Sequence, residues 1–141
     1  IDGNICGEHD GLMDYTMGQR KGLGIGGGHG FKEAPWFVAD KDLDNNILIV
    51  AQGHDHPSLF HHGLEADQIH WINEAPTNSL ENISAKIRYR QDDQSCRITE
   101  LSKNNCKVIF NEPQFAITPG QSVVFYIDNK CMGGAIIDKR F

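Results

Sequence analysis

Residues 18–28 hold the side chains best suited to bind an anion. Six of these eleven residues are glycines, which allow positive φ and let a partner approach the main chain closely. Beside them stand Gln19, Arg20 and Lys21, an amide and two cations. An arginine fork and a lysine point charge next to an accessible backbone suit a phosphate or an RNA backbone. The other interpretation is a glycine-rich turn between strands with two solvated cations.

The same stretch lacks the pattern of a nucleotide-binding loop. No Gly-Lys-Ser/Thr sequence follows at the Walker spacing. The string Gly22-x-Gly24-x-x-Gly27 fits the dinucleotide fingerprint, but no hydrophobic strand precedes it and no amphipathic helix follows it. The glycines therefore do not predict a bound nucleotide.

The cysteines and histidines predict neither a nucleophile nor a metal site. Cys6 has Glu8 and His9 close in sequence, but adjacency does not build a catalytic pair, so we expect a small thiol buried in a strand. The four cysteines form no C-x-x-C pair and fit no zinc spacing, which predicts reduced thiols in a cytosolic protein. Four histidines have alternating or adjacent spacing, which predicts a loop with solvated side chains. They are His54, His56, His61 and His62.

Residues 84–91 predict a strand with a row of cations on one face. Apolar and cationic side chains alternate strictly there, so Lys86, Arg88 and Arg90 would project to the same side. Three like charges in a row repel one another unless a polyanion or counterions neutralise them. The alternative is a solvated outer face that is balanced by carboxylates on neighbouring strands.

Charge and composition divide the chain near residue 76. Residues 1–76 carry four Lys and Arg against twelve Asp and Glu, whereas residues 77–141 carry nine against seven. Residues 75–79 have the composition of a linker, and we therefore predict domains at 1–76 and 77–141. No apolar run is long enough to span a membrane, so we expect a soluble protein without a membrane partner.

The predicted fold is mainly β, with a small first domain followed by a six-stranded barrel. Residues 35–41 and 47–51 predict a hairpin whose second strand is buried on both faces, and residues 64–73 predict a further strand. Residues 118–121 have Pro and Gly in the positions of a type II turn. Six short strands separated by turns predict a small closed barrel in the second part. The predicted strands are 84–91, 96–101, 106–110, 115–117, 122–127 and 135–137.

Four motifs, in this order and spacing, resemble the C-terminal portion of the tRNA-specific 2-thiouridylases. The resemblance covers essentially the whole chain. The motifs are Gly7-Glu8-His9-Asp10-Gly11, Tyr15-Thr16-x-Gly18-Gln19-Arg20-Lys21-Gly22-Leu23-Gly24-Ile25, Lys86-Ile87-Arg88-Tyr89-Arg90-Gln91 and Thr118-Pro119-Gly120-Gln121-Ser122.

The resemblance implies a part of an enzyme that replaces an oxygen of the wobble uridine by sulfur. Family enzymes use ATP, with Mg, in an N-terminal domain that carries a Ser-Gly-Gly-x-Asp-Ser loop and two catalytic cysteines. This chain contains no such loop, it begins at Ile1, and Cys6 resembles neither catalytic cysteine. We therefore expect the central domain and the translation-factor-like β-barrel only, with no catalytic residue and no cofactor of their own.

The resemblance also implies partners and contact residues. Arg88 and Tyr89 match barrel positions that contact tRNA, and Gln121 matches a further one. Weaker candidates, from our own interpretation of the charges, are Gln19, Arg20, Lys21, Lys86 and Arg90. The implied partners are tRNAs for glutamine, lysine and glutamate and, through the N-terminal domain, a sulfur-relay protein. Tyr89 would lie opposite Arg88 in a regular strand, so an edge strand or a bulge would be needed to present both.

Two other functions stay open on the sequence alone. One is a protein-interaction barrel, and the other is a small stand-alone enzyme that uses Cys6 and the histidines. An upstream Ser-Gly-Gly-x-Asp-Ser loop would decide for the thiouridylase.

Overall fold

The structure is a computed structural model that describes residues 2–20, 23, 34–76 and 80–141. These described residues form eight β-strands and two short 3-10 helices, so the predicted mainly-β class is confirmed. The chain divides into two compact units, Ile1–Phe60 and His61–Phe141. Across the described residues, no helix has the length and apolarity needed to cross a membrane.

The first unit is built on the predicted hairpin. Strands β1 (Trp36–Asp42) and β2 (Ile47–Gln52) pair antiparallel, with an irregularity between Val38 and Asp40. The Asp42 carboxylate accepts hydrogen bonds from the main-chain N–H and the side-chain amide of Asn45, which hold the turn and lower the pKa of Asp42. Hydrogen bonds between residues that are close in sequence therefore stabilise the turn of the hairpin.

The core of the first unit takes side chains from the hairpin and from two 3-10 helices, η1 (Leu12–Asp14) and η2 (Pro57–Leu59). The sequence predicted that residues 47–51 are buried on both faces, but Ile47 is 49% exposed. Of the residues of β2, only Val50 and Ala51 are buried. The buried side chains of this unit are Leu12, Tyr15, Phe37, Val38, Ala39, Val50, Ala51 and Leu59.

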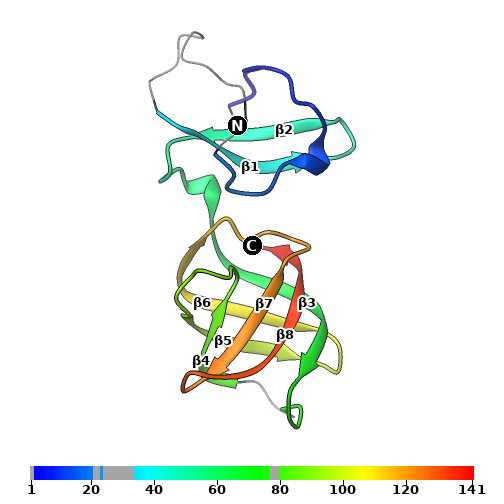
Figure 1. Cartoon of the computed structure of the whole chain (residues 1–141), viewed down its shortest axis with the longest axis vertical. Helices are drawn as coiled ribbons and strands as arrows, with labels where there is room; N and C mark the ends of the chain where they lie inside the picture. The colour runs from blue at the N-terminus through cyan, green and yellow to red at the C-terminus, as the bar shows by residue number, and fades with distance from the viewer. Residues whose placement is uncertain (1, 21–22, 24–33, 77–79) are drawn as a thin grey trace. The chain divides into compact units, whose positions relative to one another are not determined.

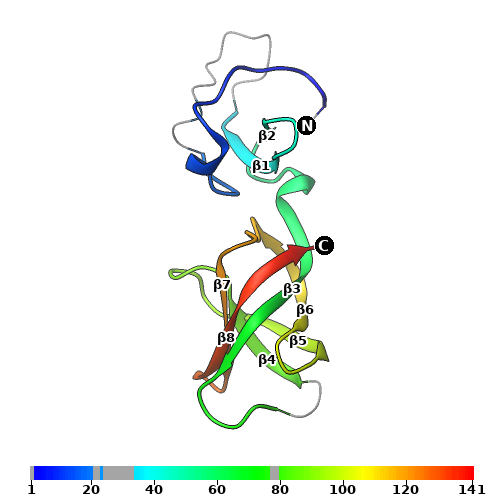
Figure 2. The same ribbon diagram turned by 90° about the vertical axis from the view of Figure 1, so that its right-hand side faces the viewer.

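The second unit is a closed antiparallel barrel of six strands in the order β3-β6-β5-β4-β7-β8. Figures 1 and 2 show these strands wrapping around a common interior. The predicted six-stranded barrel is thus confirmed. The strands are β3 (Phe60–Trp71), β4 (Leu80–Lys86), β5 (Gln94–Leu101), β6 (Cys106–Phe115), β7 (Ser122–Ile127) and β8 (Lys130–Arg140).

The barrel interior is filled by every second side chain of its strands. On β5 the inward residues are Cys96 and Ile98, and on β7 they are Val123 and Phe125. Trp71 stacks on Phe125 with ring centroids 5.8 Å apart. A barrel of this size is closed by side chains, so it encloses a packed core and no channel.

The boundary predicted between residues 76 and 77 differs from the division of the structure, which falls between Phe60 and His61. Strand β3 belongs to the barrel, where it pairs with β8 and lies beside β6. The linker-like composition at residue 76 marks a connection within the barrel. His61 and His62, which were expected in a loop, lie on β3.

Several strand predictions are wrong in their bounds, and the predicted strand 115–117 does not form, because Phe115 ends β6 and residues 116–117 lie in a loop; β3 takes the sixth place in the barrel. Strand β6 runs through Pro113 without a break, because its pairing with β5 ends at Phe110 and the proline removes no bond from that ladder. Strand β8 begins five residues before the predicted 135–137, and it includes Gly133. A Cβ on Gly133 would meet the His70 carbonyl of β3 at 2.2 Å, so glycine permits this close strand pairing.

Candidate RNA interface

The predicted row of three cations does not form, because β4 ends at Lys86. The Gln91 side-chain oxygen accepts a hydrogen bond from the Ile87 N–H (3.1 Å), and the Gln91 N–H donates to the Arg88 carbonyl (3.3 Å). These two bonds close a turn, and the main chain leaves the sheet. The β4–β5 loop, residues 87–93, therefore carries the side chains that the sequence placed on a strand.

The three cations have separate surroundings. The Lys86 ammonium lies 5.2 Å from the centroid of the Tyr126 ring on β7. Arg88 points to the β6–β7 loop, and Arg90 is exposed in the turn. The charges are thus dispersed, which removes the repulsion expected of a row.

Arg88 holds two consecutive main-chain carbonyls. Its Nη2 donates to the carbonyls of Phe115 (2.6 Å) and Ala116 (3.1 Å), and its guanidinium lies 4.9 Å from the centroid of the Phe115 ring. Burial lowers the pKa of Arg88, but the group stays charged because arginine is not deprotonated in proteins. Arg88 therefore joins the β4–β5 loop to the end of β6.

Tyr89 is the most exposed large aromatic side chain among the described residues, with 97% of its surface accessible. Because it lies in the turn, strand alternation does not apply to it, and neither an edge strand nor a bulge is needed to present it near Arg88. Arg90, which follows, is also exposed. An exposed ring between two arginines is an arrangement on which a nucleic-acid base can stack.

Gln121 ends the β6–β7 loop, residues 116–121, in the predicted turn. The Gln121 N–H donates to the Thr118 carbonyl (3.2 Å), and Gly120 has φ +92°, as type II requires. Strand β8 holds the main chain on both sides of this position, because Ile137 donates to the Gln121 carbonyl (2.8 Å) and accepts from the Gly120 N–H (2.7 Å). The exposed Gln121 side chain thus stands on a fixed main chain.

A glutamine chain that the sequence analysis missed supports the same region. Gln91 donates its amide to the Gln114 side-chain oxygen (3.0 Å). Gln114 is 4% exposed and donates to the Glu112 carbonyl (3.0 Å) and to the side chain of Gln94 (3.5 Å). Glutamine spacing carries no periodic signal, so only the fold could bring these side chains together.

The candidates from the glycine-rich stretch lie in the first unit. Gln19 pairs with β1, where its carbonyl accepts from the Val38 N–H (2.9 Å), and its side-chain oxygen accepts from the Thr16 N–H (3.0 Å). Gln19 thus holds the main chain, whereas Arg20 is exposed. Lys21 lies outside the described residues.

In the described part of the chain, the Cys6 thiol donates to the Asn4 carbonyl and not to His9, and Cys96 and Cys106 are buried. Cys6 is half-buried and lies in no strand, contrary to the expected strand position. The ring of His9 contacts the Asn46 carbonyl (2.9 Å) and the Gly11 N–H (3.0 Å), so both of its nitrogens are engaged. Burial raises the pKa of Cys96 to about 12 and of Cys106 to about 11, so both thiols are protonated at neutral pH.

The potential metal ligands in the described part of the chain do not converge on one point. No group of three or more His, Cys, Asp or Glu side chains there is placed to hold a metal ion. His56 accepts hydrogen bonds from the Ser58 N–H at the start of η2, which is a capping role. The expectation that the chain binds no metal stays a prediction.

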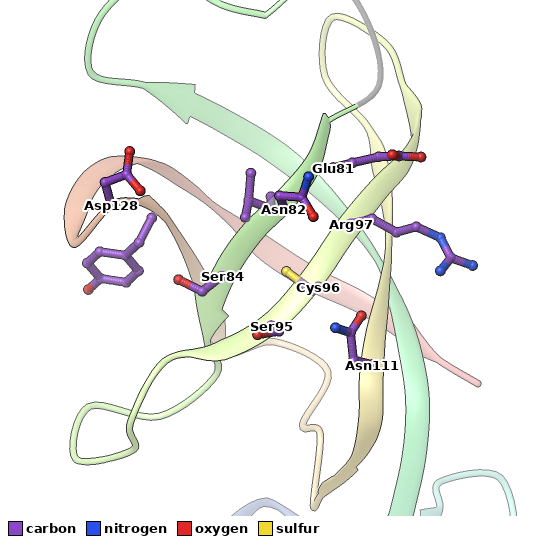
Figure 3. A pocket seen from close by; sticks show the side chains of 10 residues that line it. Glu81, Asn82, Ser84, Ser95, Cys96, Arg97, Asn111 and Asp128 are labelled. Atoms are coloured by element: carbon purple, nitrogen blue, oxygen red, sulfur yellow. The ribbon is translucent and has the colours of Figure 1, made fainter.

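Two of the surface hollows lined by described residues lie on the barrel. The first has a volume of about 450 Å³, and Figure 3 shows that polar side chains of β4, β5 and their neighbours line it. Pockets for small molecules are mostly apolar, so this lining does not favour one. The labelled residues around it are Glu81, Asn82, Ser84, Ser95, Cys96, Arg97, Asn111 and Asp128.

The second hollow, of about 600 Å³, is acidic. Four carboxylates and one lysine line it, and this balance repels a polyanion such as RNA. Its charged residues are Glu65, Asp67, Glu100, Lys107 and Asp138. In the linked β4–β5 and β6–β7 loops, Asp92 and Asp93 balance the charges of Arg88 and Arg90. These loops are therefore a candidate RNA surface through the exposed Tyr89 ring and the Gln121 amide, and not through net charge.

Two family matches follow the two units. Residues 61–137 match the aminomethyltransferase beta-barrel domain, and residues 1–52 match the tRNA methyl transferase PRC-barrel domain. The first match begins where the barrel unit begins. The matched families and the structural division thus agree on where the barrel starts.

Curated relatives align with nearly the whole chain. It is 54% identical over 140 residues to the tRNA-specific 2-thiouridylase MnmA of Klebsiella pneumoniae subsp. pneumoniae, and 53% identical over 141 residues to that of Vibrio parahaemolyticus. The protein of the same name from Serratia proteamaculans is 52% identical over 140 residues. Each match covers 99% of this chain and 38% of the relative, so the chain spans well under half the length of these relatives.

Proposed function

Because the chain belongs to the tRNA-specific 2-thiouridylase family, we propose that it forms a tRNA-binding part of an enzyme that thiolates tRNA. The family is the one that the four sequence motifs indicated. The proposed activity of the whole enzyme is the transfer of sulfur to the wobble uridine, and this chain contributes contacts that bind the tRNA. The proposed substrates are tRNAs for glutamine, lysine and glutamate, in the cytoplasm.

The observation that carries the proposal is the 97% exposure of Tyr89 between two arginines. A single exposed aromatic residue is common on protein surfaces, so the exposure of Tyr89 supports the proposal only together with its neighbour Arg90, and it leaves the ring accessible for stacking. Bases that are unpaired in tRNA loops stack on such rings, and Arg90 beside it can meet the neighbouring phosphate. Gln121 offers an uncharged amide that can donate to or accept from a base or a ribose.

The binding energy has to come from these local groups. The formal net charge of the chain is −6, so its overall field opposes a polyanion. Arg90 and Tyr89 on one loop, with Gln121 on the loop that Arg88 joins to it, supply a cation, a ring and an amide. We expect the chain alone to bind tRNA weakly, with the rest of the family polypeptide adding contacts.

The chemistry itself belongs to other parts of the family polypeptide. The resemblance implies ATP, with Mg, to activate the uridine, and a relay protein to deliver sulfur. The residues of this chain do not fit ATP, because the sequence contains no Ser-Gly-Gly-x-Asp-Ser loop. The chain by itself should therefore neither hydrolyse ATP nor thiolate tRNA, and sulfur incorporated by the purified chain would disprove this.

Binding of unmodified tRNA to the chain, titrated from low to physiological salt, tests the proposal. Gln121→Ala should cost about 1 kcal/mol and leave the salt dependence unchanged, because glutamine carries no charge. Arg90→Ala should reduce the slope of log K against log salt by about one, the change expected when one phosphate contact is lost. Arg97 is an exposed arginine of β5, and Arg97→Ala is the matched control. It should change neither the tRNA affinity nor its salt dependence.

Unaltered affinity of both variants at every salt concentration would contradict the proposal. The linked loops would then be a solvated surface of the barrel, and the protein-interaction function would gain support.

A further inference from the structure

We propose that Arg88 is a positioning residue that docks the β4–β5 loop onto the end of β6, so that Tyr89 is held in place before tRNA arrives. Arg88 then acts through Tyr89 and does not meet a phosphate itself. This inference rests on the proposed function, since it assigns a role within the same tRNA surface.

Two side chains that flank Tyr89 reach three consecutive residues of the neighbouring segment. Arg88, one residue before, donates to the carbonyls of Phe115 and Ala116. Gln91, two residues after, donates to the side chain of Gln114. The ring of Tyr89, at 97% exposure, contributes almost no packing of its own. Its placement therefore depends on its two neighbours.

The segment that receives Arg88 has main-chain carbonyls that need hydrogen-bond donors. Ala116 has φ +53°, a left-handed conformation that is unfavourable for an alanine. Its buried carbonyl accepts from Arg88 and from the Thr118 hydroxyl (2.9 Å), and the next carbonyl, of Ile117, accepts from Arg140 Nη1 (3.3 Å). Main-chain carbonyls that no longer pair with a neighbouring strand need other hydrogen-bond donors. Arg88 and Arg140 supply donors to the carbonyls of Ala116 and Ile117.

The same segment is independently fixed to β8. The bonds of Gly120 and Gln121 with Ile137 hold its far end, and Arg140 of β8 holds Ile117. The β6–β7 loop is therefore a rigid platform, and Arg88 fastens the Tyr89 loop to it. Preorganisation of this kind raises affinity because the loop loses less freedom when it binds.

The alternative role for Arg88 is a direct phosphate contact, and the two roles give opposite salt behaviour. A phosphate ligand releases a counterion, so its removal lowers the salt slope by about one. A residue that faces main-chain carbonyls releases none, so its removal weakens binding without changing the slope. The guanidinium already lies over the Phe115 ring and on two carbonyls, which favours the second behaviour.

The test combines tRNA affinity with a measurement that needs no tRNA. We expect Arg88→Ala and Tyr89→Ala each to reduce the affinity of the chain for unmodified tRNA by about 5–100-fold, the range for one stacked base. The double variant should lose no more than the larger single loss, and all slopes should equal that of the wild type. In the free chain, hydrogen exchange at the amides of Ile87 and Gln91 should accelerate in Arg88→Ala.

Arg88→Met, which keeps the length of the side chain, replaces Arg88→Ala if the alanine variant does not fold. Arg97→Lys is the control and should leave affinity, slope and exchange unchanged. A slope reduced by one, or additive losses in the double variant, would overturn the positioning role. Unchanged exchange at Ile87 and Gln91 would overturn it as well.

The outcomes also separate this inference from the proposed function. If Tyr89→Ala binds tRNA as the wild type does, the proposed tRNA surface fails, and the role of Arg88 toward Tyr89 fails with it. If Tyr89→Ala loses affinity and Arg88→Ala does not, the tRNA surface stands and only the positioning role is disproved.

Discussion

The two segments that the sequence marked for RNA binding use the same division of labour over different distances. In the first unit, Gln19 holds the main chain through Thr16, three residues away, and its neighbour Arg20 is exposed. In the barrel, Arg88 holds the carbonyls of residues 115 and 116, and its neighbour Tyr89 is exposed. In each pair one polar side chain bonds the main chain, although Arg88 is itself exposed, and the adjacent residue is exposed as well.

The two segments differ in how far away in sequence the residues that hold them lie. The Gln19 contact is local to a turn and to one strand pairing, whereas the Arg88 contact and the glutamine chain join two loops that lie far apart in sequence. The β4–β5 loop is held by residues that are remote in sequence, so its order depends on the folded barrel that brings those residues close. We therefore expect larger effects from breaking the barrel links than from breaking the local one.

The largest effect on stability is expected for Gln114→Ala. This substitution removes the buried amide that bonds to the side chains of Gln91 and Gln94, so both lose a hydrogen-bond partner. The free energy of unfolding should therefore fall by about 1–3 kcal/mol. Urea denaturation measures the change. Glu112→Ala, at an exposed position two residues away, should stay within about 0.5 kcal/mol of the wild type. Equal stability of the two variants would mean that the glutamine chain does not hold the loops.

Tyr89 should show a large effect on binding and almost none on folding. Tyr89→Ala should weaken tRNA binding by about 1–3 kcal/mol, and Tyr89→Phe should retain most of the affinity, because stacking needs the ring and not the hydroxyl. Thermal unfolding of both variants should match the wild type, since the ring is 97% exposed. A loss for Tyr89→Phe as large as for Tyr89→Ala would instead indicate a hydrogen bond from the hydroxyl.

The local segment should respond least. Gln19→Ala should lower the stability of the first unit by about 1 kcal/mol, the contribution of one hydrogen bond, as followed by denaturation of the chain. Arg20→Ala should leave stability unchanged, and if Arg20 meets a phosphate it should lower the salt slope of tRNA binding by about one. A stability loss for Arg20→Ala larger than for Gln19→Ala would reverse the roles assigned to this pair.

The sequence predicted those features that depend on neighbouring residues. Turn residues at 42–46 and 118–121 marked the hairpin and the type II turn, and alternating side chains marked the barrel strands. The end of β4 was missed because residues 84–91 alternate without a break, whereas the bonds of Gln91 turn the chain away after Lys86. Strand β3 was assigned to the wrong part because its partners, β6 and β8, follow much later in the chain.

The sequence proposed the residues of the candidate site, which stay a prediction, and it did not separate their roles. The resemblance indicated Arg88, Tyr89 and Gln121, and the cation pattern indicated Arg88 independently. Neither could separate a side chain that faces solvent from one that bonds the main chain, because both kinds of residue are polar in the sequence. That distinction requires the distance between Arg88 and the Ala116 carbonyl, which only the folded barrel sets.

The most direct test of the account is a map of the amides that tRNA perturbs, measured by NMR on the isotope-labelled 141-residue chain. Unmodified tRNA added at low salt should shift resonances of residues 88–91 and 118–121 most, with the side-chain amide of Gln121 among them, and the shifts should fade as salt rises. Residues around the acidic hollow, such as Asp67 and Asp138, should not move. Shifts concentrated at that hollow, or none at residues 88–91 and 118–121 while tRNA binds, would contradict the assignment of these two loops as the tRNA surface.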